Sequence, residues 1–190
     1  NQLLFFNGLN LTSPINAAII MTSNPIIVLL VASILIKEKI TRNKISGVLI
    51  GAAGAILLIL HSNNPDTAGS FSGDLMVLIN AISYGVYLVL VKPLMKSYQP
   101  ITVICWVFLF GFLFVMPFGF GQFNAINWGS FDTNSFLSVL YVVVATTFLA
   151  YLLNVFALKS VQPSVVSSYI YLQPVFATGF LLLFSFLEVY

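Results

Sequence analysis

Long apolar stretches without charged side chains recur along the chain, separated by short polar segments. The six charge-free runs are residues 14–36, 45–60, 75–91, 101–120, 135–158 and 161–187. A helix needs about 20 apolar residues to cross the roughly 30 Å hydrocarbon core of a bilayer. The run 45–60 is short, but His61 and Ser62 extend it. The pattern predicts an all-α polytopic membrane protein with about six full transmembrane helices.

The composition supports this interpretation. Hydrophobic residues make up 59% of the chain and charged residues only 6%, with a mean hydropathy of +1.04. Soluble domains contain about 25% charged residues. A soluble enzyme or binding module is therefore excluded, and membrane lipid is an expected partner.

The charged residues divide the loops into two kinds. All seven Lys and Arg residues fall in three alternate loops: Lys37, Lys39, Arg42 and Lys44, then Lys92 and Lys96, then Lys159. The intervening loops, 61–74 and 121–134, contain Asp66, Asp74 and Asp132 but no Lys or Arg. The positive-inside rule places the basic loops in the cytoplasm. Topology thus accounts for the net charge of +2, and no nucleic-acid partner is expected.

Residues 9–25 and 158–174 resemble each other and indicate an internal duplication. Two prolines and the amide residue before the second one coincide in the overlay, each pair 149 residues apart: Pro14 with Pro163, Asn24 with Gln173, and Pro25 with Pro174. Five steps along the series of runs separate the two copies, so they cross the membrane in opposite directions. This predicts an inverted-repeat transporter whose function lies between the halves.

Pro25 and Pro174 lie in the middle of their runs, where each removes one helical hydrogen bond. In one reading, polar neighbours such as Asn24 and Gln173 satisfy the released backbone groups. In the other, the two kinks let the helices bend during alternating access and expose backbone to substrate. We treat Asn24, Pro25, Gln173 and Pro174 as candidate kink and gating residues.

Several short motifs in both halves share a family pattern. They are LNLTSP at 9–14, IKEKI at 36–40, SGVLIGAAG at 46–54, GDL at 73–75, NAISY at 80–84, FAL at 156–158 and YLQPVFA at 171–177. Over nearly its whole length the chain resembles the EamA family of the drug/metabolite transporter superfamily. That resemblance implies ten helices built as an inverted five-plus-five repeat, with both termini cytoplasmic.

The resemblance also divides the chain. Residues 1–62 would be the end of the first repeat, with the end of the third helix and the fourth and fifth helices. Residues 63–73 would be an extracytoplasmic linker, and residues 74–190 would be the second repeat, with the sixth to ninth helices. The tenth helix is then missing, and we interpret the chain as a fragment.

Polar side chains inside the apolar runs indicate where a substrate binds, because such residues usually face a bundle interior or a water-filled cavity. They recur at helical spacing on three of the runs. The candidate cavity-lining residues are Asn80, Tyr84, Tyr87, Tyr151, Asn154, Ser167 and Tyr171. For the serines the alternative is that they bond their own backbone or allow close helix packing.

No nucleotide-binding, zinc-protease or CxxC motif is present, and the runs lack an acid, base or nucleophile constellation. The sequence therefore predicts neither an enzyme nor a cofactor or metal site. Glu38, between Lys37 and Lys39, is expected to be a solvated or interfacial cap, with a role in energy coupling as the alternative. The spacing of Gly47 and Gly51 favours packing within the fold, with a homodimer as the alternative.

Together these features predict a carrier that moves small metabolites or drugs by alternating access, as a permease or efflux protein of a bacterial inner membrane. The polar, uncharged cavity would suit neutral or zwitterionic solutes, amino acids among them. The alternative is a non-transporting membrane protein, lipid-handling or regulatory, with the same fold.

Overall fold

The structure is a computed structural model that describes residues 2–61, 70–176 and 179. The described residues form helices joined by short connections, and no strand occurs among them, as the apolar runs predict. In chain order they are α1 (Gln2–Leu11), α2 (Pro14–Met21), α3 (Asn24–Leu35), α4 (Arg42–His61), α5 (Phe71–Leu94), α6 (Pro100–Asn124), η1 (Trp128–Ser130), α7 (Thr133–Tyr141), η2 (Val142–Leu149), α8 (Ala150–Ser160), α9 (Pro163–Ser168) and η3 (Tyr169–Leu172). The fold forms two units, residues 1–90 with 162–190 and residues 91–161.

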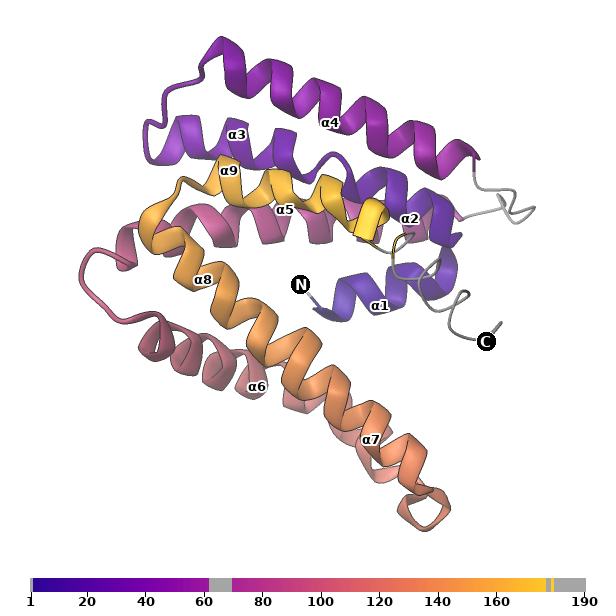
Figure 1. The fold of residues 1–190 in the computed structure, drawn as a ribbon. Helices are drawn as coiled ribbons and strands as arrows, with labels where there is room; N and C mark the ends of the chain where they lie inside the picture. Colours follow the sequence, from indigo (N-terminus) through magenta and orange to yellow (C-terminus); the bar gives the residue numbers. More distant parts are fainter. Residues whose placement is uncertain (1, 62–69, 177–178, 180–190) are drawn as a thin grey trace, which may run out of the picture. The chain divides into compact units, whose positions relative to one another are not determined.

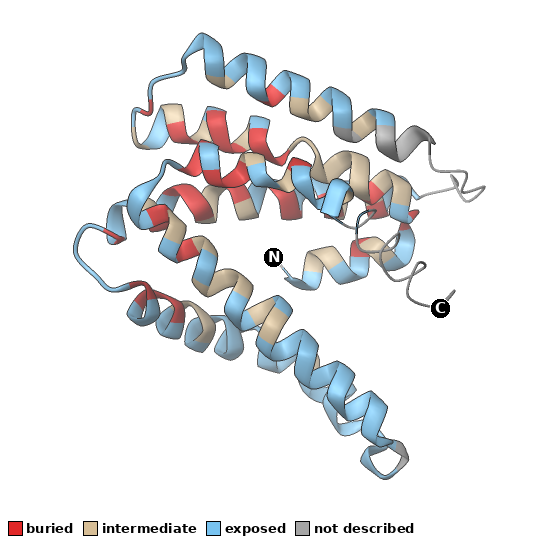
Figure 2. Ribbon diagram, in the orientation of Figure 1, coloured by how far each residue is buried: buried red, intermediate tan, exposed pale blue. Residues whose placement is uncertain are grey.

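In the first unit the other helices pack against the consecutive helices α2 and α3. Here α3 packs against α9, and α2 packs against α4 (Figure 1). Both α3 and α5 carry buried apolar residues, among them Val28, Ala32, Val77 and Ala81 (Figure 2). The break between α2 and α3 falls at Thr22 and Ser23, and η3 interrupts the helix after α9. Both interruptions lie just before the repeated prolines.

Local sequence explains where α2 begins and where α3 ends. The Ser13 hydroxyl accepts the Asn16 N–H at 3.1 Å, and Pro14 occupies the first turn, where its missing N–H leaves no bond unmade. At the other end Lys37 has a φ of 55°, and the Glu38 N–H donates to the Ala32 carbonyl at 3.1 Å. This left-handed cap turns the chain back toward α4.

The second unit is a pair of long helices. α6 packs against α8, and the segments α7, η2 and α8 follow one another through a π-helical stretch (Figure 1). Asp132 caps α7, with the Ser135 N–H 2.9 Å from its Oδ1. Hydrogen bonds from the Ser135 side chain and backbone lower the pKa of this carboxyl. Most apolar side chains on α6 and α7 are exposed, as expected of surfaces that face lipid (Figure 2).

Four helical stretches among the described residues are long and apolar enough to cross a membrane. They are Pro14–Leu35, Phe71–Leu94, Pro100–Asn124 and Thr133–Ser160. They coincide with four of the six predicted runs. The run 45–60 lies within the 20-residue helix α4. Part of the run 161–187 and most of the predicted linker 63–73 fall outside the described residues, so the helix count, the repeat and the division at that linker stay predictions.

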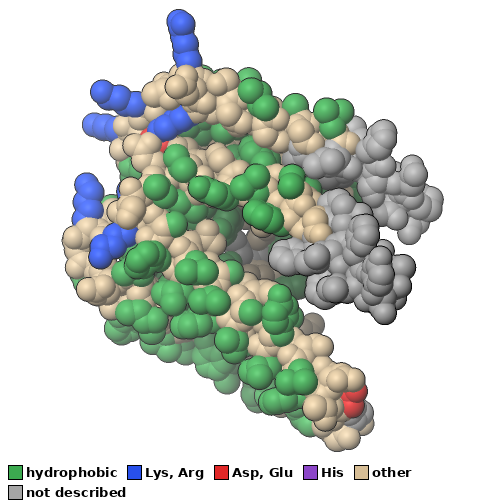
Figure 3. Space-filling view, viewed as in Figure 1, with side chains coloured by type: hydrophobic (Ala, Val, Ile, Leu, Met, Phe, Trp, Pro, Cys, Tyr) green, Lys and Arg blue, Asp and Glu red, His purple; other side chains and the backbone are tan. Residues whose placement is uncertain are grey.

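Charge separates along each unit in the way that the positive-inside rule requires. In the first unit the cluster from Lys37 to Lys44 follows α3, while Asp74 accepts a hydrogen bond from Thr12, before α2. In the second unit Lys92 donates to the Leu158 carbonyl near the end of α8 at 2.7 Å. Asp132 lies at the opposite end of the continuous segment formed by α7, η2 and α8. In Figure 3 the Lys and Arg side chains of the first unit project from the surface near the connection between α3 and α4.

Gly73 permits the close approach of α5 to the turn between α1 and α2. A Cβ at this position would lie 2.7 Å from both the Leu11 carbonyl carbon and the Thr12 nitrogen, which are backbone atoms. We expect Gly73→Ala to destabilise the protein by about 1–3 kcal/mol through overpacking, measured as a lower Tm of the detergent-solubilised protein. Gly111→Ala is the control, because a Cβ there meets nothing within 4 Å. An unchanged Tm for Gly73→Ala would contradict this close approach.

Candidate functional site

The interruptions in the two proline-containing helices are joined by a direct hydrogen bond. The Tyr171 hydroxyl donates to the Thr22 carbonyl at 3.0 Å, across 149 residues of chain. That separation equals the offset between the two repeated segments, so Thr22 and Tyr171 are equivalent positions of the predicted repeats. Equivalent positions that touch lie close to any two-fold axis that relates the repeats. The bond therefore indicates the centre of the predicted pseudosymmetry.

The break between α2 and α3 supplies the carbonyl that Tyr171 satisfies. The Ile26 N–H donates to the Ser23 carbonyl at 3.0 Å instead of continuing the α-helical pattern to Thr22. Pro25 has no N–H with which to bond the Met21 carbonyl. Ser23 satisfies a different group, since its hydroxyl donates to the Ile20 carbonyl at 2.6 Å. The released Thr22 carbonyl thus depends on a side chain from the second repeated segment.

Two buried asparagines attach the break to α5. Asn24 Nδ2 donates to the Ala81 carbonyl at 3.3 Å, and Asn80 Nδ2 lies 3.8 Å from Met21 Sδ. Their side chains are almost fully buried, and neither Oδ1 atom has a hydrogen-bond partner among the described residues. Buried amide oxygens are nearly always hydrogen-bonded. Each of these two oxygens therefore lacks the partner that a buried amide oxygen usually has among the described residues.

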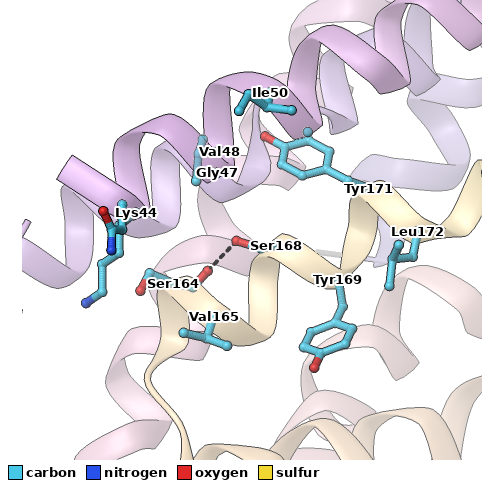
Figure 4. Close-up of a pocket in the computed structure, with 12 residues that line it drawn as sticks. Lys44, Gly47, Val48, Ile50, Ser164, Val165, Ser168, Tyr169, Tyr171 and Leu172 are labelled. Carbon is cyan, nitrogen blue, oxygen red and sulfur yellow. Dashed lines mark hydrogen bonds between the residues drawn. The ribbon is translucent and has the colours of Figure 1, made fainter. Parts of the chain in front are cut away.

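A pocket of about 550 Å³ opens between α4 and the α9–η3 segment (Figure 4). We call it the α4 pocket. Its walls combine the small residues of α4 with polar residues of α9 and η3, including Lys44, Gly47, Gly51, Ser164, Ser168 and Tyr171. The ring of Tyr171 lies against Gly51, where a Cβ would be 2.3 Å from Cδ2 of the ring. The ring and hydroxyl of Tyr171 thus fit only beside a glycine.

A second pocket of about 410 Å³ lies between α1, α2 and the chain after Tyr169. We call it the proline pocket. Its wall includes Pro14, Met21, Thr22, Gln173 and Pro174. Since Tyr171 lines the α4 pocket and Thr22 lines the proline pocket, their hydrogen bond joins the walls of the two.

The structure divides the predicted site residues between the two units. Asn24, Pro25, Asn80, Tyr84, Tyr87, Ser167, Tyr171, Gln173 and Pro174 belong to the first. The rings of Tyr84 and Tyr87 stack with centroids 6.1 Å apart. The Ser167 hydroxyl donates to the Ser164 carbonyl at 3.1 Å, in line with the backbone-bonding alternative for the serines.

Tyr151 and Asn154 belong to the second unit. The Tyr151 ring lies 5.8 Å from that of Phe108, measured between centroids. Asn154 Nδ2 donates to the Ala150 carbonyl of its own helix at 2.9 Å. The grouping of these two residues with the others in one cavity stays a prediction.

Glu38 departs from its expected environment. The sequence predicts a solvated or interfacial cap, but only 1% of the side chain is exposed. Its Oε1 lies 2.8 Å from Lys44 Nζ and accepts a hydrogen bond from the Ser164 hydroxyl. The predicted solvent exposure is wrong. The neighbouring lysines indicate an exposed position, but Ser164, which donates a hydrogen bond to Glu38, lies 126 residues away in the sequence.

These features can be compared with known proteins. The EamA-like transporter family matches residues 1–60 and 71–187. The chain belongs to this family. An uncharacterized transporter of Archaeoglobus fulgidus is 26% identical over 92% of this chain and 60% of its own length. The uncharacterized transporter YyaM of Bacillus subtilis is 25% identical over 90% of this chain and 57% of its own.

A plant protein and a solved structure are also similar to this chain. A WAT1-related chloroplastic protein of Arabidopsis thaliana is 28% identical over 91% of this chain and 43% of its own. A protein of known crystal structure aligns with a TM-score of 0.75 and 18% identity over 97% of this chain and 63% of its own, which shows a shared fold. The EamA chain described here spans about three fifths or less of these relatives' length.

The family and the apolar helical spans agree in indicating an integral membrane protein. Two of these relatives are named transporters.

Gly51 is the residue on which the position of Tyr171 depends. We expect Gly51→Ala to displace the ring, weaken its bond to Thr22 and lower the Tm, with a loss of about 1–3 kcal/mol. Gly47→Ala on the same helix is the matched control, because a Cβ there meets nothing within 4 Å. The loss should disappear when Gly51→Ala is made in a Tyr171→Ala background. Equal losses in both backgrounds would show that Gly51 acts elsewhere.

Proposed function

We propose that this protein carries small metabolites or drugs across a membrane by alternating access between two inverted repeats. Membership of the EamA-like transporter family and the four apolar helical spans support a membrane transporter in general. The observation that carries the mechanism is the hydrogen bond from Tyr171 to Thr22, between equivalent positions of the two repeated segments. Transporters of inverted-repeat architecture bind substrate near the midplane, at interruptions of this kind.

The chemistry of the two pockets favours a neutral or zwitterionic substrate, such as an amino acid. Among the described residues that line either pocket, Lys44 is the one charged residue, and it lies at the first turn of α4. Near the break the polar side-chain groups include the amides of Asn24 and Asn80 together with the Tyr171 hydroxyl. Such groups recognise hydrogen-bond donors without requiring a net charge.

The remaining predicted residues extend this proposal. Asn80, Tyr84 and Tyr87 follow one another at helical spacing on α5, and Tyr151 and Asn154 do so on α8. We propose that they complete the cavity wall in the full-length protein. The proposal includes a bacterial inner membrane as the location, because the short loops follow the positive-inside pattern.

A non-transporting membrane protein, lipid-handling or regulatory, is the second candidate. The specific observation in its favour is the apolar character of the α4 pocket, whose walls include Val48, Ile50, Val165 and Leu172. An acyl chain or an apolar partner helix would fit such walls. Saturable flux of a polar solute distinguishes the two candidates.

The transport proposal predicts the behaviour of Tyr171→Phe. This change keeps the ring and removes the hydroxyl, which leaves the released Thr22 carbonyl without its donor, a loss of about 1–3 kcal/mol. We expect several-fold slower flux of the transported solute in proteoliposomes that contain the full-length protein, after a screen of neutral, zwitterionic, anionic and cationic metabolites. A Tyr171→Ala variant should lose flux entirely.

Tyr141→Phe is the control for this experiment, because Tyr141 is exposed on α7. It should transport as the unchanged protein does. Absence of saturable flux for every solute, with the protein correctly inserted, would favour the non-transporting candidate. Flux confined to strongly anionic solutes and unaffected at Tyr171 would contradict the proposed substrate class.

A further inference from the structure

Glu38 is a buried carboxylate that the proposed transport site does not use. Acidic side chains are almost never fully buried unless they are paired. Here both pairing partners bond the same oxygen, Oε1: Lys44 through an ion pair at 2.8 Å and Ser164 through its hydroxyl. The other oxygen, Oε2, is buried and has no hydrogen-bond partner among the described residues. The carboxylate therefore depends on these two contacts for its stabilisation.

The partners of Glu38 come from both repeated halves. Glu38 and Lys44 lie on either side of the turn from α3 to α4, and Ser164 lies in the first turn of α9. Lys44 extends the connection, since its Nζ also donates to the Gln162 side-chain oxygen and, at 3.2 Å, to the Lys39 carbonyl. We call the group Glu38, Lys44, Gln162 and Ser164 the Glu38 cluster. It joins the start of the second proline-containing helix to the end of the first.

The backbone holds Glu38 in place for this role. Lys37 adopts a φ of 55°, and the Glu38 N–H is bonded to Ala32 at the end of α3. This cap fixes the direction in which the Glu38 side chain leaves the helix. In Figure 4, Lys44 and Ser164 lie near each other at one end of the α4 pocket, away from Tyr171. A separation of α9 from α4 at this end would break every contact between the halves in the cluster.

We propose that the Glu38 cluster is an interaction that keeps the basic, cytoplasmic end of the two halves closed, and that its opening is a step of transport. Glu38 is a positioning residue in this proposal, because it acts on α9 through Ser164 and does not contact substrate. The proposal rests on the proposed function for its meaning, but its test measures opening without any substrate.

The titratable and charged groups that face Glu38 are few. Lys44 is its ionic partner, and Lys39 contributes its backbone carbonyl to the same ammonium group. From α9 the facing groups are the hydroxyl of Ser164 and, through Lys44, the amide of Gln162. Loss of the Glu38 charge would therefore leave Lys44 without its anionic partner and weaken its contact with Gln162.

The test measures how fast a thiol in the α4 pocket reacts with a membrane-impermeant maleimide in inside-out vesicles. The reporter is Ser168→Cys, in a full-length protein that otherwise lacks cysteine, because Ser168 is half-buried and lines the pocket. Glu38→Gln removes the charge and keeps the shape of the side chain. We expect labelling to be about tenfold faster, which corresponds to about 1.4 kcal/mol.

Two matched pairs of variants support the comparison. Lys39→Gln removes an exposed charge next to Glu38 and should label as the unchanged protein does. Ser164→Ala should accelerate labelling, whereas Ser164→Thr keeps a hydroxyl and should not. A second reporter, Val155→Cys, is fully buried in the other unit and detects unfolding. Neither Glu38→Gln nor Ser164→Ala should increase the labelling of the Val155→Cys reporter.

Unchanged labelling at Ser168→Cys in both Glu38→Gln and Ser164→Ala would overturn the proposal. If Glu38→Gln also exposes Val155→Cys, that variant has unfolded, and Ser164→Ala alone decides. Faster labelling in a protein that shows no flux would support the cluster while contradicting the proposed transport function. Flux without any change in labelling would support the proposed transport function and contradict the proposed role of the Glu38 cluster.

Discussion

The rest of the first unit is arranged around one constraint, that a backbone carbonyl released inside a membrane helix must find a donor within the protein. A bilayer core offers no water for this purpose, and an unsatisfied group costs several kcal/mol. Pro25 makes the break, and the chain through Thr22 and Ser23 no longer follows the α-helical pattern. Tyr171 supplies the donor from the second repeated segment. The break in one half is thus stable only when the other half is in place.

This requirement explains why small residues lie where they do. Tyr171 reaches Thr22 only because Gly51 leaves room for its ring, and α5 reaches the turn before α2 only because Gly73 has no side chain. Helix packing in membranes relies on such small residues, since there is no hydrophobic effect to drive helices together within lipid. Asn24 and Asn80 then fix the break against α5 with side-chain contacts. Close packing and polar contacts thus both hold the interruption between α2 and α3 in place.

The sequence predicts the features that depend on local composition or on a regular spacing. Apolar runs predict the helices because length and hydropathy are properties of each segment alone. The offset of 149 residues between Pro25 and Pro174 predicts two related interruptions. It does not predict that Tyr171 contacts Thr22, because Thr22 carries no signal of a released carbonyl. The burial of Glu38 is also invisible, since its neighbours Lys37 and Lys39 are exposed and Ser164 is distant in sequence.

The contact at Tyr171 and the Glu38 cluster differ in what a rocking motion would do to them. Ser164 lies seven residues before Tyr171, which along helical chain is about 10 Å. If α9 turned about a point near the Tyr171 hydroxyl by about 15°, a rotation of the size seen between subunits of allosteric proteins, Ser164 would move by about 2.5 Å. Its hydrogen bond to Glu38 would break, while the bond from Tyr171 to Thr22 would change little. In the proposed motion a contact near the axis would therefore persist, whereas a contact farther from it would break; the proposal thus assigns the role of a pivot to the bond between Tyr171 and Thr22 and that of a gate to the Glu38 cluster.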